Sequence, residues 1–382
     1  RPGGAEHGGS EGMSATELTD EQRETRGLAR RFAEEEIAPH AATWDRERTF
    51  PLDVFGRLGE LGLMGVCVPV EYGGAGADHL SYALVLEELS RADAGVGVTV
   101  AVHTGAGTLP VLAHGTEEQR RRIVPPLAQG HELAAFALTE PDAGSDAAAM
   151  RTRYDEATGT VTGTKQWITN GSYARHVTVF ARDGERVSAF ATRTFEAVRE
   201  EEKLGLHSSS TADLRFEASP AERLGPPGAG MRIALSTLDG GRIGIAAQAV
   251  GIAQAALDLA AGYAKQRNAF GRPIGAFQAI SHKLAEMQTE IEAARALVWR
   301  AARLKDAGRP HTVEGAQAKL FASRVARHWT GEAIQVLGGY GYTREFPAER
   351  YYRDAKVTEI YEGTSEIQRL VIARGLLGEI AG

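Results

Sequence analysis

The first third of the chain repeats apolar residues every three or four positions, which is the spacing of amphipathic helices. Residues 19–22 and 116–119 each place a threonine three positions before a glutamine, and such capping boxes predict two helix starts. We expect the first helix to end near Pro39 and the second at Pro125–Pro126, because proline cannot donate a helical hydrogen bond. The apolar face of the first helix would consist of Leu28, Phe32 and Ile37.

From about Phe136 to Phe216 the pattern changes to short β-branched runs with alternating apolar positions, as at Val177 and Val179. This alternation predicts an antiparallel β domain, either a barrel or a small sandwich. The proline and glycine residues at 225–230 predict a connector out of it.

The last third returns to helical spacing in four segments, at about 231–266, after Phe277, at about 313–337 and after Glu362. Four long amphipathic helices predict a four-helix bundle. The predicted fold class is therefore α+β. Its parts are a flexible tail (1–15), an N-terminal α-helical domain (16–134), a central antiparallel β domain (135–228) and a C-terminal four-helix bundle (229–382).

Composition narrows the possible functions. The chain has 382 residues, 43% of them hydrophobic, and a formal net charge of −7, with basic residues scattered rather than clustered. We therefore expect no nucleic-acid partner. The single cysteine, Cys67, fits a reducing cytoplasm and is expected to be a small buried hydrophobe. No apolar run approaches the length of a membrane span, and residues 1–15 lack the apolar core of a signal peptide, so we expect a cytoplasmic protein without membrane contact.

Common cofactor and metal motifs are missing from the sequence. No phosphate-binding P-loop occurs, and no G-x-G-x-x-G follows a strand, so a Rossmann site is not predicted. The eleven histidines are dispersed, and we predict no metal site.

Five segments combine chemically useful residues: FALTEPDAGSD (136–146), KQWITNGS (165–172), QRNAFGRP (266–273), QVLGGYGY (335–342) and EIYEGTSEIQRL (359–370). Each has an ordinary structural explanation when taken alone. These are a β-turn, a core tryptophan, an arginine favoured by a helix C-terminus, a glycine C-cap and a solvated loop glutamate. Trp167 and Thr169, two residues apart, would share one face of a strand.

Taken together, these segments and STLDGGRIGIAAQAVGIAQAALD (236–258) resemble the acyl-CoA dehydrogenase family in its order and spacing, from about Leu18 to the C-terminus. The C-terminal segment is most similar to short-chain, butyryl-type members. The resemblance implies the same three-part fold and non-covalent binding of FAD. It also implies a homotetramer that passes electrons to an electron-transfer flavoprotein.

The resemblance implies a set of FAD-binding residues. One wall of the flavin site would be Phe136, Leu138, Thr139, Gly144 and Ser145, and the other Trp167, Ile168 and Thr169. Contacts to the pyrophosphate region would come from Arg267, Phe270 and Gln278, and contacts to a neighbouring subunit's FAD from Gln335, Gly338 and Gly339. The start of the last helix would contribute Thr364, Ser365 and Glu366, with Ser365 as N-cap and Gln368 completing a capping box.

The resemblance also implies a catalytic role for Glu362, which would remove the α-proton of an acyl thioester while a β-hydride passes to flavin N5. The backbone N–H of Glu362 and a ribityl hydroxyl would polarise the thioester carbonyl. Further substrate contacts would come from Ser145, Asp239, Arg242, Tyr361 and Gly363. Asp239 and Arg242 lie three apart on one helix, so an intrahelical ion pair is their ordinary explanation. One branch of the family carries its base on this helix, but here positions 240 and 241 are glycines.

Three alternatives stay open. Residues 205–219 are a looser version of the family's segment, with His207 and Ser208 at positions where it commonly has a basic residue and glycine, so the acyl carrier is either CoA or an acyl-carrier protein. A flavin oxidase or monooxygenase shares the fold, and a non-catalytic partner that has lost its flavin is the third possibility.

Residues 96–105 are expected to line the acyl pocket, with His103 as a structural histidine.

Overall fold

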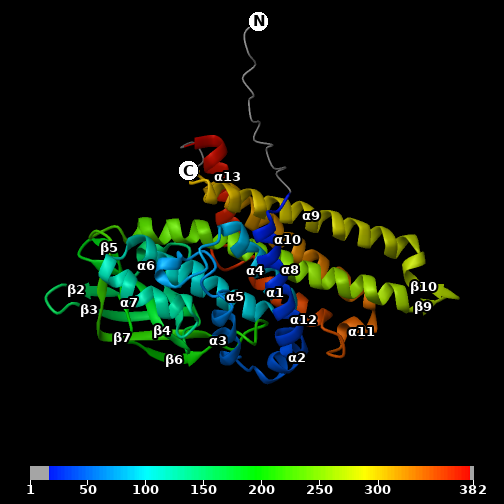
Figure 1. Ribbon diagram of the computed structural model, residues 1–382, viewed down its shortest axis with the longest axis horizontal. Helices are drawn as coiled ribbons and strands as arrows, with labels where there is room; N and C mark the ends of the chain where they lie inside the picture. Colours follow the sequence, from blue (N-terminus) through cyan, green and yellow to red (C-terminus); the bar gives the residue numbers. More distant parts are fainter. Residues whose placement is uncertain (1–16, 379–382) are drawn as a thin grey trace, which may run out of the picture.

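The computed structural model describes residues 17–378, and the tail expected over residues 1–15 lies outside them. Along the longest axis, a β-sheet occupies one end of the molecule and long C-terminal helices reach the other, with the N-terminal helices over the middle (Figure 1). The predicted α+β layout of helices, sheet and helices is therefore confirmed.

The N-terminal part is helical, and both predicted capping boxes form. Thr19 and Thr116 each accept a hydrogen bond from the backbone N–H three residues on, and the glutamine side chains bond back. The elements are α1 (Asp20–Phe32), η1 (Ala33–Ile37), α2 (Ala38–Glu47), α3 (Leu52–Glu60), η2 (Val70–Tyr72), α4 (His79–Ala92), α5 (Ala94–Ala101), η3 (Val102–Thr108), α6 (Leu109–His114) and α7 (Glu117–Ala128).

Both helix ends predicted at prolines are wrong. The π-helical turn η1 follows α1 directly, and Pro39 lies in the first turn of α2, where a helix does not need the missing N–H. Pro125 and Pro126 lie inside α7, which continues to Ala128. Burial of the final turn of α7 against the core outweighs the intrinsic cost of proline there.

The central part forms one hydrogen-bonded sheet with the strand order β6-β7-β3-β2-β4-β5-β8 and β1 added beside β4. Most neighbours are antiparallel, but β1 runs parallel to β4, and β2 meets β4 in parallel at one residue pair. The purely antiparallel prediction is therefore wrong at β1, which arrives from α7 rather than from a hairpin. The strands are β1 (Leu133–Ala137), β2 (Arg153–Asp155), β3 (Thr160–Thr169), β4 (Ala174–Asp183), β5 (Arg186–Thr192), β6 (Glu196–Glu200), β7 (Thr211–Pro220) and β8 (Glu222–Leu224), with η4 (Ala147–Ala149) between β1 and β2.

The C-terminal helices start where the sequence predicts them. Alanine and glycine on α8 let α4, α9 and α10 pack closely against it, so one apolar core joins the N-terminal and C-terminal helices. The short α13 packs on α10, and Gln368 is its one buried residue within the described chain. The elements are α8 (Gly230–Gln266), β9 (Asn268–Ala269), β10 (Arg272–Pro273), η5 (Ile274–Ala276), α9 (Gln278–Asp306), α10 (Thr312–Leu337), α11 (Gly339–Tyr342), α12 (Ala348–Val357) and α13 (Ser365–Leu377).

Two helical stretches are long and apolar enough to cross a membrane, namely Ala94–His114 and Gly230–Gln266, so the expectation that no run reaches this length is wrong. In each stretch, 83% of the most apolar window is buried inside the fold. Packing in the protein core thus accounts for the apolar character of both helices.

Candidate active site

Glu362 lies in the short loop between α12 and α13, and its backbone is in the left-handed region with φ 53°. Its carboxylate points at the surface of α8, where a β-carbon added to Gly241 would lie 2.5 Å from Oε2 of Glu362. The missing side chain of Gly241 is therefore what makes room for the acid. Oε2 is buried and has no hydrogen-bond partner among the described residues.

Side chains from α8, α10 and α13 form hydrogen bonds with this loop. Lys319 of α10 donates from Nζ to the carbonyl of Gly363 at 2.5 Å, and Nε2 of Gln368 donates to the same carbonyl at 2.7 Å. Gln368 also donates to the carbonyl of Glu362 at 3.2 Å, and the hydroxyl of Tyr361 donates to Gln248 of α8. The main chain of the loop is therefore anchored, while the Glu362 carboxylate is left unpaired.

Burial dominates the electrostatics of this loop. It raises the pKa of Glu362 to about 7, and the positive charges of Lys319 and Arg242 oppose that rise. Burial also lowers the pKa of Lys319 to about 8, against the opposing effect of the Glu362 charge. A carboxyl group whose pKa is near 7 can both accept and release a proton at neutral pH.

Thr364, not Ser365, is the N-cap of α13, which corrects the sequence-based assignment. The Thr364 hydroxyl accepts from the N–H of Ile367, and Ser365 is already the first residue of the helix. Gln368 does not complete a capping box, because its amide is used by the carbonyls of Glu362 and Gly363. Glu366 is exposed in the first turn of α13.

The predicted intrahelical ion pair of Asp239 and Arg242 is present. Nη1 of Arg242 donates to Oδ1 of Asp239 at 2.6 Å, and the hydroxyl of Thr312 donates to Oδ2 at 2.7 Å. Arg242 is buried, and its Nε has no partner among residues 17–378. The positive charge of Arg242 lowers the pKa of Glu362, so the Asp239–Arg242 pair belongs to the same site.

A second group of predicted residues meets where β1 ends beside β3. The N–H of Gln166 donates to the carbonyl of Thr139 at 2.9 Å, and the buried Lys165 donates to the carbonyl of Leu138 and to Glu140, both at 2.9 Å. These bonds place the segment after β1 against β3. Gly144 and Ser145 lie further along that segment and are exposed, whereas Phe136 packs edge-on to Phe180.

Trp167 is not a core residue, since 57% of it is exposed. Its φ of 58° is left-handed, and the register of β3 with β7 shifts between Lys165 and Ile168. This bulge interrupts the alternation on which the shared face of Trp167 and Thr169 was predicted. Ile168 is buried, and Thr169 is half-buried at the end of the strand.

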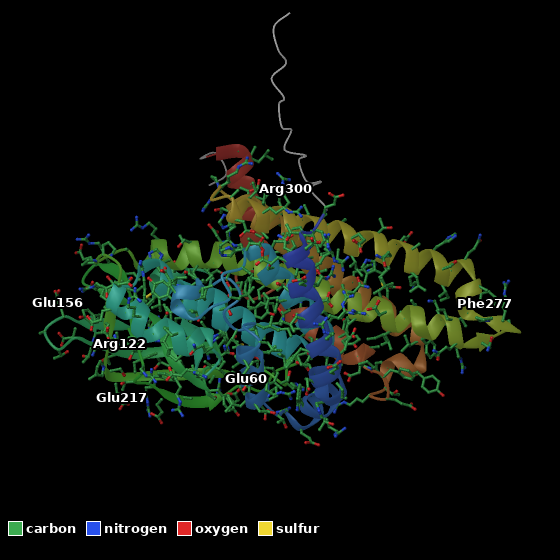
Figure 2. All side chains as sticks on the ribbon, viewed as in Figure 1. Glu60, Arg122, Glu156, Glu217, Phe277 and Arg300 are labelled. Atoms are coloured by element: carbon green, nitrogen blue, oxygen red, sulfur yellow. The ribbon has the colours of Figure 1, made fainter. Side chains whose placement is uncertain are left out.

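A third group gathers at the far tip of the C-terminal helices. Arg267 ends α8, exposed Phe270 lies in the β9–β10 turn, and Gln278 begins α9 beside Phe277 (Figure 2). The guanidinium of Arg267 lies 6.0 Å from the centre of the Tyr340 ring. That contact brings in the end of α10, where Gln335, Gly338 and Gly339 are exposed.

Comparison with known proteins assigns the chain to a family. Sequence models of the acyl-CoA dehydrogenase N-terminal, middle and C-terminal domains match residues 19–131, 135–219 and 228–377. The chain belongs to the acyl-CoA dehydrogenase family. It is an acyl-CoA dehydrogenase, an oxidoreductase, and its named relatives share nearly its whole length.

One such relative of this acyl-CoA dehydrogenase is the mitochondrial short-chain specific acyl-CoA dehydrogenase of Bos taurus. It is 48% identical over 377 residues, covering 95% of this chain and 92% of the relative. Among solved structures, butyryl-CoA dehydrogenase from Megasphaera elsdenii has a TM-score of 0.91 at 43% identity, covering 94% of this chain and 99% of that one.

Two further solved structures share the fold at lower sequence identity. An acyl-CoA dehydrogenase from Bacillus anthracis complexed with FAD has a TM-score of 0.89 at 34% identity, covering 95% of this chain and 68% of that one. The prolyl acyl carrier protein oxidase AnaB has a TM-score of 0.89 at 31% identity, covering 94% of this chain and 100% of that one.

Several residues of this acyl-CoA dehydrogenase site were missed by sequence reasoning, namely Gly241 as a contact of the carboxylate, and Lys319, Gln248 and Gln368 as anchors of the loop. Lys319 carried a usable signal, because it is a charged residue among alanines on an apolar helix face. His103 is structural as expected, since its ring nitrogens contact the carbonyl of Leu127 and the N–H of Ala134. In the looser segment at 205–219, the N–H of Leu206 donates to Asp354 and the hydroxyl of Ser208 donates to Asp93.

Proposed function

We propose that this chain catalyses the α,β-dehydrogenation of short- to medium-chain acyl-CoA to trans-2-enoyl-CoA, with Glu362 as the base that takes the α-proton. The observation that carries this proposal is the unpaired Glu362 carboxylate, aimed at Gly241 from an anchored loop. The relatives named as short-chain specific and butyryl-CoA dehydrogenases support a short acyl chain. We further propose a cytoplasmic enzyme whose electron acceptor is an electron-transfer flavoprotein.

Glu362 must be ionised to accept a proton, so its pKa sets the lower end of the activity range. Because burial raises the pKa of Glu362 to about 7, activity is expected to rise with pH through that value. The backbone N–H of Glu362 has no acceptor among residues 17–378. It is therefore available to a thioester oxygen as negative charge develops there. Substrate contacts are assigned to Ser145, Asp239, Arg242, Tyr361 and Gly363.

The residues assigned below would hold FAD, which would supply the acceptor for the hydride that leaves the β-carbon. The residues present fit this group, because the indole of Trp167 is exposed and the neighbouring Gln166 donates its N–H to the carbonyl of Thr139. The first turn of α9 has no side-chain cap, so its N–H groups and Arg267 suit a pyrophosphate. The residues assigned to FAD are Phe136, Leu138, Thr139, Gly144, Ser145, Trp167, Ile168, Thr169, Arg267, Phe270, Gln278, Gln335, Gly338, Gly339, Thr364, Ser365 and Glu366.

These FAD residues occupy two separate places in one chain. Gly241, which contacts Glu362, and Arg267 lie on the same helix, and a rise of 1.5 Å per residue puts them about 40 Å apart. This separation exceeds the length of an FAD molecule. We therefore assign the whole tip, Arg267 and Gln278 included, to the FAD of a neighbouring copy, which is consistent with a homotetramer.

An acyl-carrier-protein substrate, or an oxidase reaction on the same fold, is the second candidate. The likeness to the prolyl acyl carrier protein oxidase AnaB favours it. It ranks second because AnaB is 31% identical to this chain, whereas the butyryl-CoA dehydrogenase is 43% identical. The same Glu362 site would serve either carrier, so activity with each carrier distinguishes a CoA substrate from a carrier-protein substrate. Rapid reoxidation of the reduced enzyme by air would favour the oxidase.

The deciding experiment follows the visible spectrum of the purified protein without oxygen as butyryl-CoA is added. Flavin absorbance that bleaches is expected for the wild type. The Glu362→Gln variant should keep the absorbance and bleach about 10²- to 10⁴-fold more slowly, which is the usual contribution of a general base. Glu359→Gln is the matched control, because Glu359 lies in the same loop but pairs with Arg327 and Lys356.

Each other result has a clear meaning. A protein without colour after addition of FAD would overturn the proposal. Colour that persists with butyryl-CoA, but bleaches with acyl groups on a carrier protein, would select the second candidate. If the flavin of the Glu362→Gln variant bleached at the wild-type rate, Glu362 would not be the base.

A further inference from the structure

Lys319 is a buried cation with an unusual partner. The residue is fully buried on α10, and its Nζ donates to the backbone carbonyl of Gly363. It forms no ion pair with a carboxylate of residues 17–378, although leaving a charge buried and unpaired is costly. A lysine that only filled the core could be replaced by an apolar residue at no loss, so its charge calls for an explanation.

The surroundings of Lys319 point to Glu362. Lys319 and Gln368 bond the same carbonyl, so the residue following the base is fixed from two helices. Gly363 has φ 89°, and a β-carbon there would lie 2.7 Å from Nε2 of Gln368, so the close approach requires glycine. The left-handed backbone of Glu362 is thereby held with its carboxylate turned toward Gly241.

We propose that Lys319 is a positioning residue for Glu362. The ammonium group of Lys319 fixes the Gly363 carbonyl, and its positive charge favours the ionised form of the Glu362 carboxylate. This inference rests on the proposed role of Glu362. Four ionisable groups face that carboxylate: Lys319 from α10, Arg242 from α8, Tyr82 from α4 and Tyr361 from its own loop.

The contributions of these groups differ. Arg242 is paired with Asp239, and burial raises the pKa of both tyrosines, so both phenols stay neutral near pH 7. Although burial lowers the pKa of Lys319 to about 8, the side chain is still mainly protonated at pH 7. Lys319 is therefore the main source of unpaired positive charge at the base.

The test compares Lys319→Met with Gln368→Met by measuring kcat against pH. Methionine keeps the length and apolar stem of lysine but removes the charge, so the carboxylate should ionise less readily. The acid limb of the Lys319→Met profile is expected to move up by about one pH unit. The loss should therefore be about tenfold larger below the limb than at high pH, where only the loss of the hydrogen bond to the Gly363 carbonyl remains. Gln368→Met removes hydrogen bonds but no charge, so it should lower kcat at all pH values without moving the limb.

Two controls make the outcome decisive. Lys203→Met removes a partly buried lysine that also donates to a backbone carbonyl, that of Ser209 at 2.7 Å, and should leave the limb in place. Lys319→Gln is the second variant if methionine does not fold, and it predicts the same shift. Flavin absorbance and thermal midpoint show whether each variant is intact, and loss of an unpaired buried charge should not lower that midpoint.

An unshifted limb in folded Lys319→Met or Lys319→Gln would overturn the inference, as would an equal loss at every pH. These failures are separate from failure of the proposed function. If Glu362→Gln is inactive while the Lys319 variants show no shift, only the role of Lys319 is wrong. If Glu362→Gln is active, the base itself is misassigned.

Discussion

The Glu362 loop and the tip formed by α8, α9 and α10 are both composed of residues that the sequence singles out, yet they differ in how they are completed. The loop is closed by its own chain, since α8, α10 and α13 all contact it. The tip is open, with Phe270 95% exposed at φ 51°. A large apolar side chain in a strained, solvent-facing position supports the proposal that a neighbouring copy covers the tip.

Helix starts show the same contrast. The N-terminus of α13 is capped by Thr364 within the loop, whereas α9 begins at Gln278 without a side-chain cap. The N–H of Ile280 donates to the carbonyl of Phe277, but those of Gln278 and Ala279 have no acceptor among residues 17–378 and can bind an anion. Changes at the loop should accordingly affect the chemical step, and changes at the tip should affect cofactor binding.

The largest expected effect comes from filling the space in front of the base. In Gly241→Ala, the new methyl group would lie 2.5 Å from Oε2 of Glu362, so the carboxylate must move. A displacement of about 1 Å costs about 100-fold in rate, and we expect kcat to fall by that factor while FAD affinity is kept. Stopped-flow bleaching with butyryl-CoA measures this loss.

Gly262→Ala is the matched control on the same helix, because a β-carbon at Gly262 has nothing within 4 Å. It should leave kcat unchanged and raise stability by up to about 1 kcal/mol, the helix preference of alanine over glycine. Equal rates for Gly241→Ala and the wild type would show that the carboxylate works from another position.

The next largest effect is expected at the tip. Arg267→Ala removes a charged group from the proposed pyrophosphate site, and such a hydrogen bond contributes about 1.5–3 kcal/mol. FAD affinity should fall about 10- to 100-fold, as measured by titrating apoprotein with FAD, while the acid limb of the pH profile stays in place. Arg121→Ala, which removes an exposed arginine paired with Glu117, is the control. If Arg267→Ala bound FAD as tightly as the wild type, the tip would not be part of an FAD site.

Local signals in the sequence predicted local structure well. The capping boxes at Thr19 and Thr116 were correct because each depends on four consecutive residues. The helix ends at Pro39 and Pro125 were wrong because packing of the surrounding turns decided them. The motif around Glu362 is what led to its proposed role as the base. Its contact with Gly241 was not predicted, because 121 residues and the packing of two helices separate the pair.

The smallest expected effect tests which residue caps α13. Thr364→Ala removes the hydroxyl that accepts from the N–H of Ile367 and should cost about 1 kcal/mol. Amide hydrogen exchange over residues 365–377 should become several-fold faster. Ser365→Ala is the control, because the Ser365 hydroxyl donates to the carbonyl of Glu359, outside the helix, and accepts from no N–H of α13 among the described residues. If Ser365→Ala is the faster variant, the sequence-based cap is correct after all. If Thr364→Ala is faster and flavin absorbance is kept, the closed loop is stabilised by its own chain, as the comparison with the open tip requires.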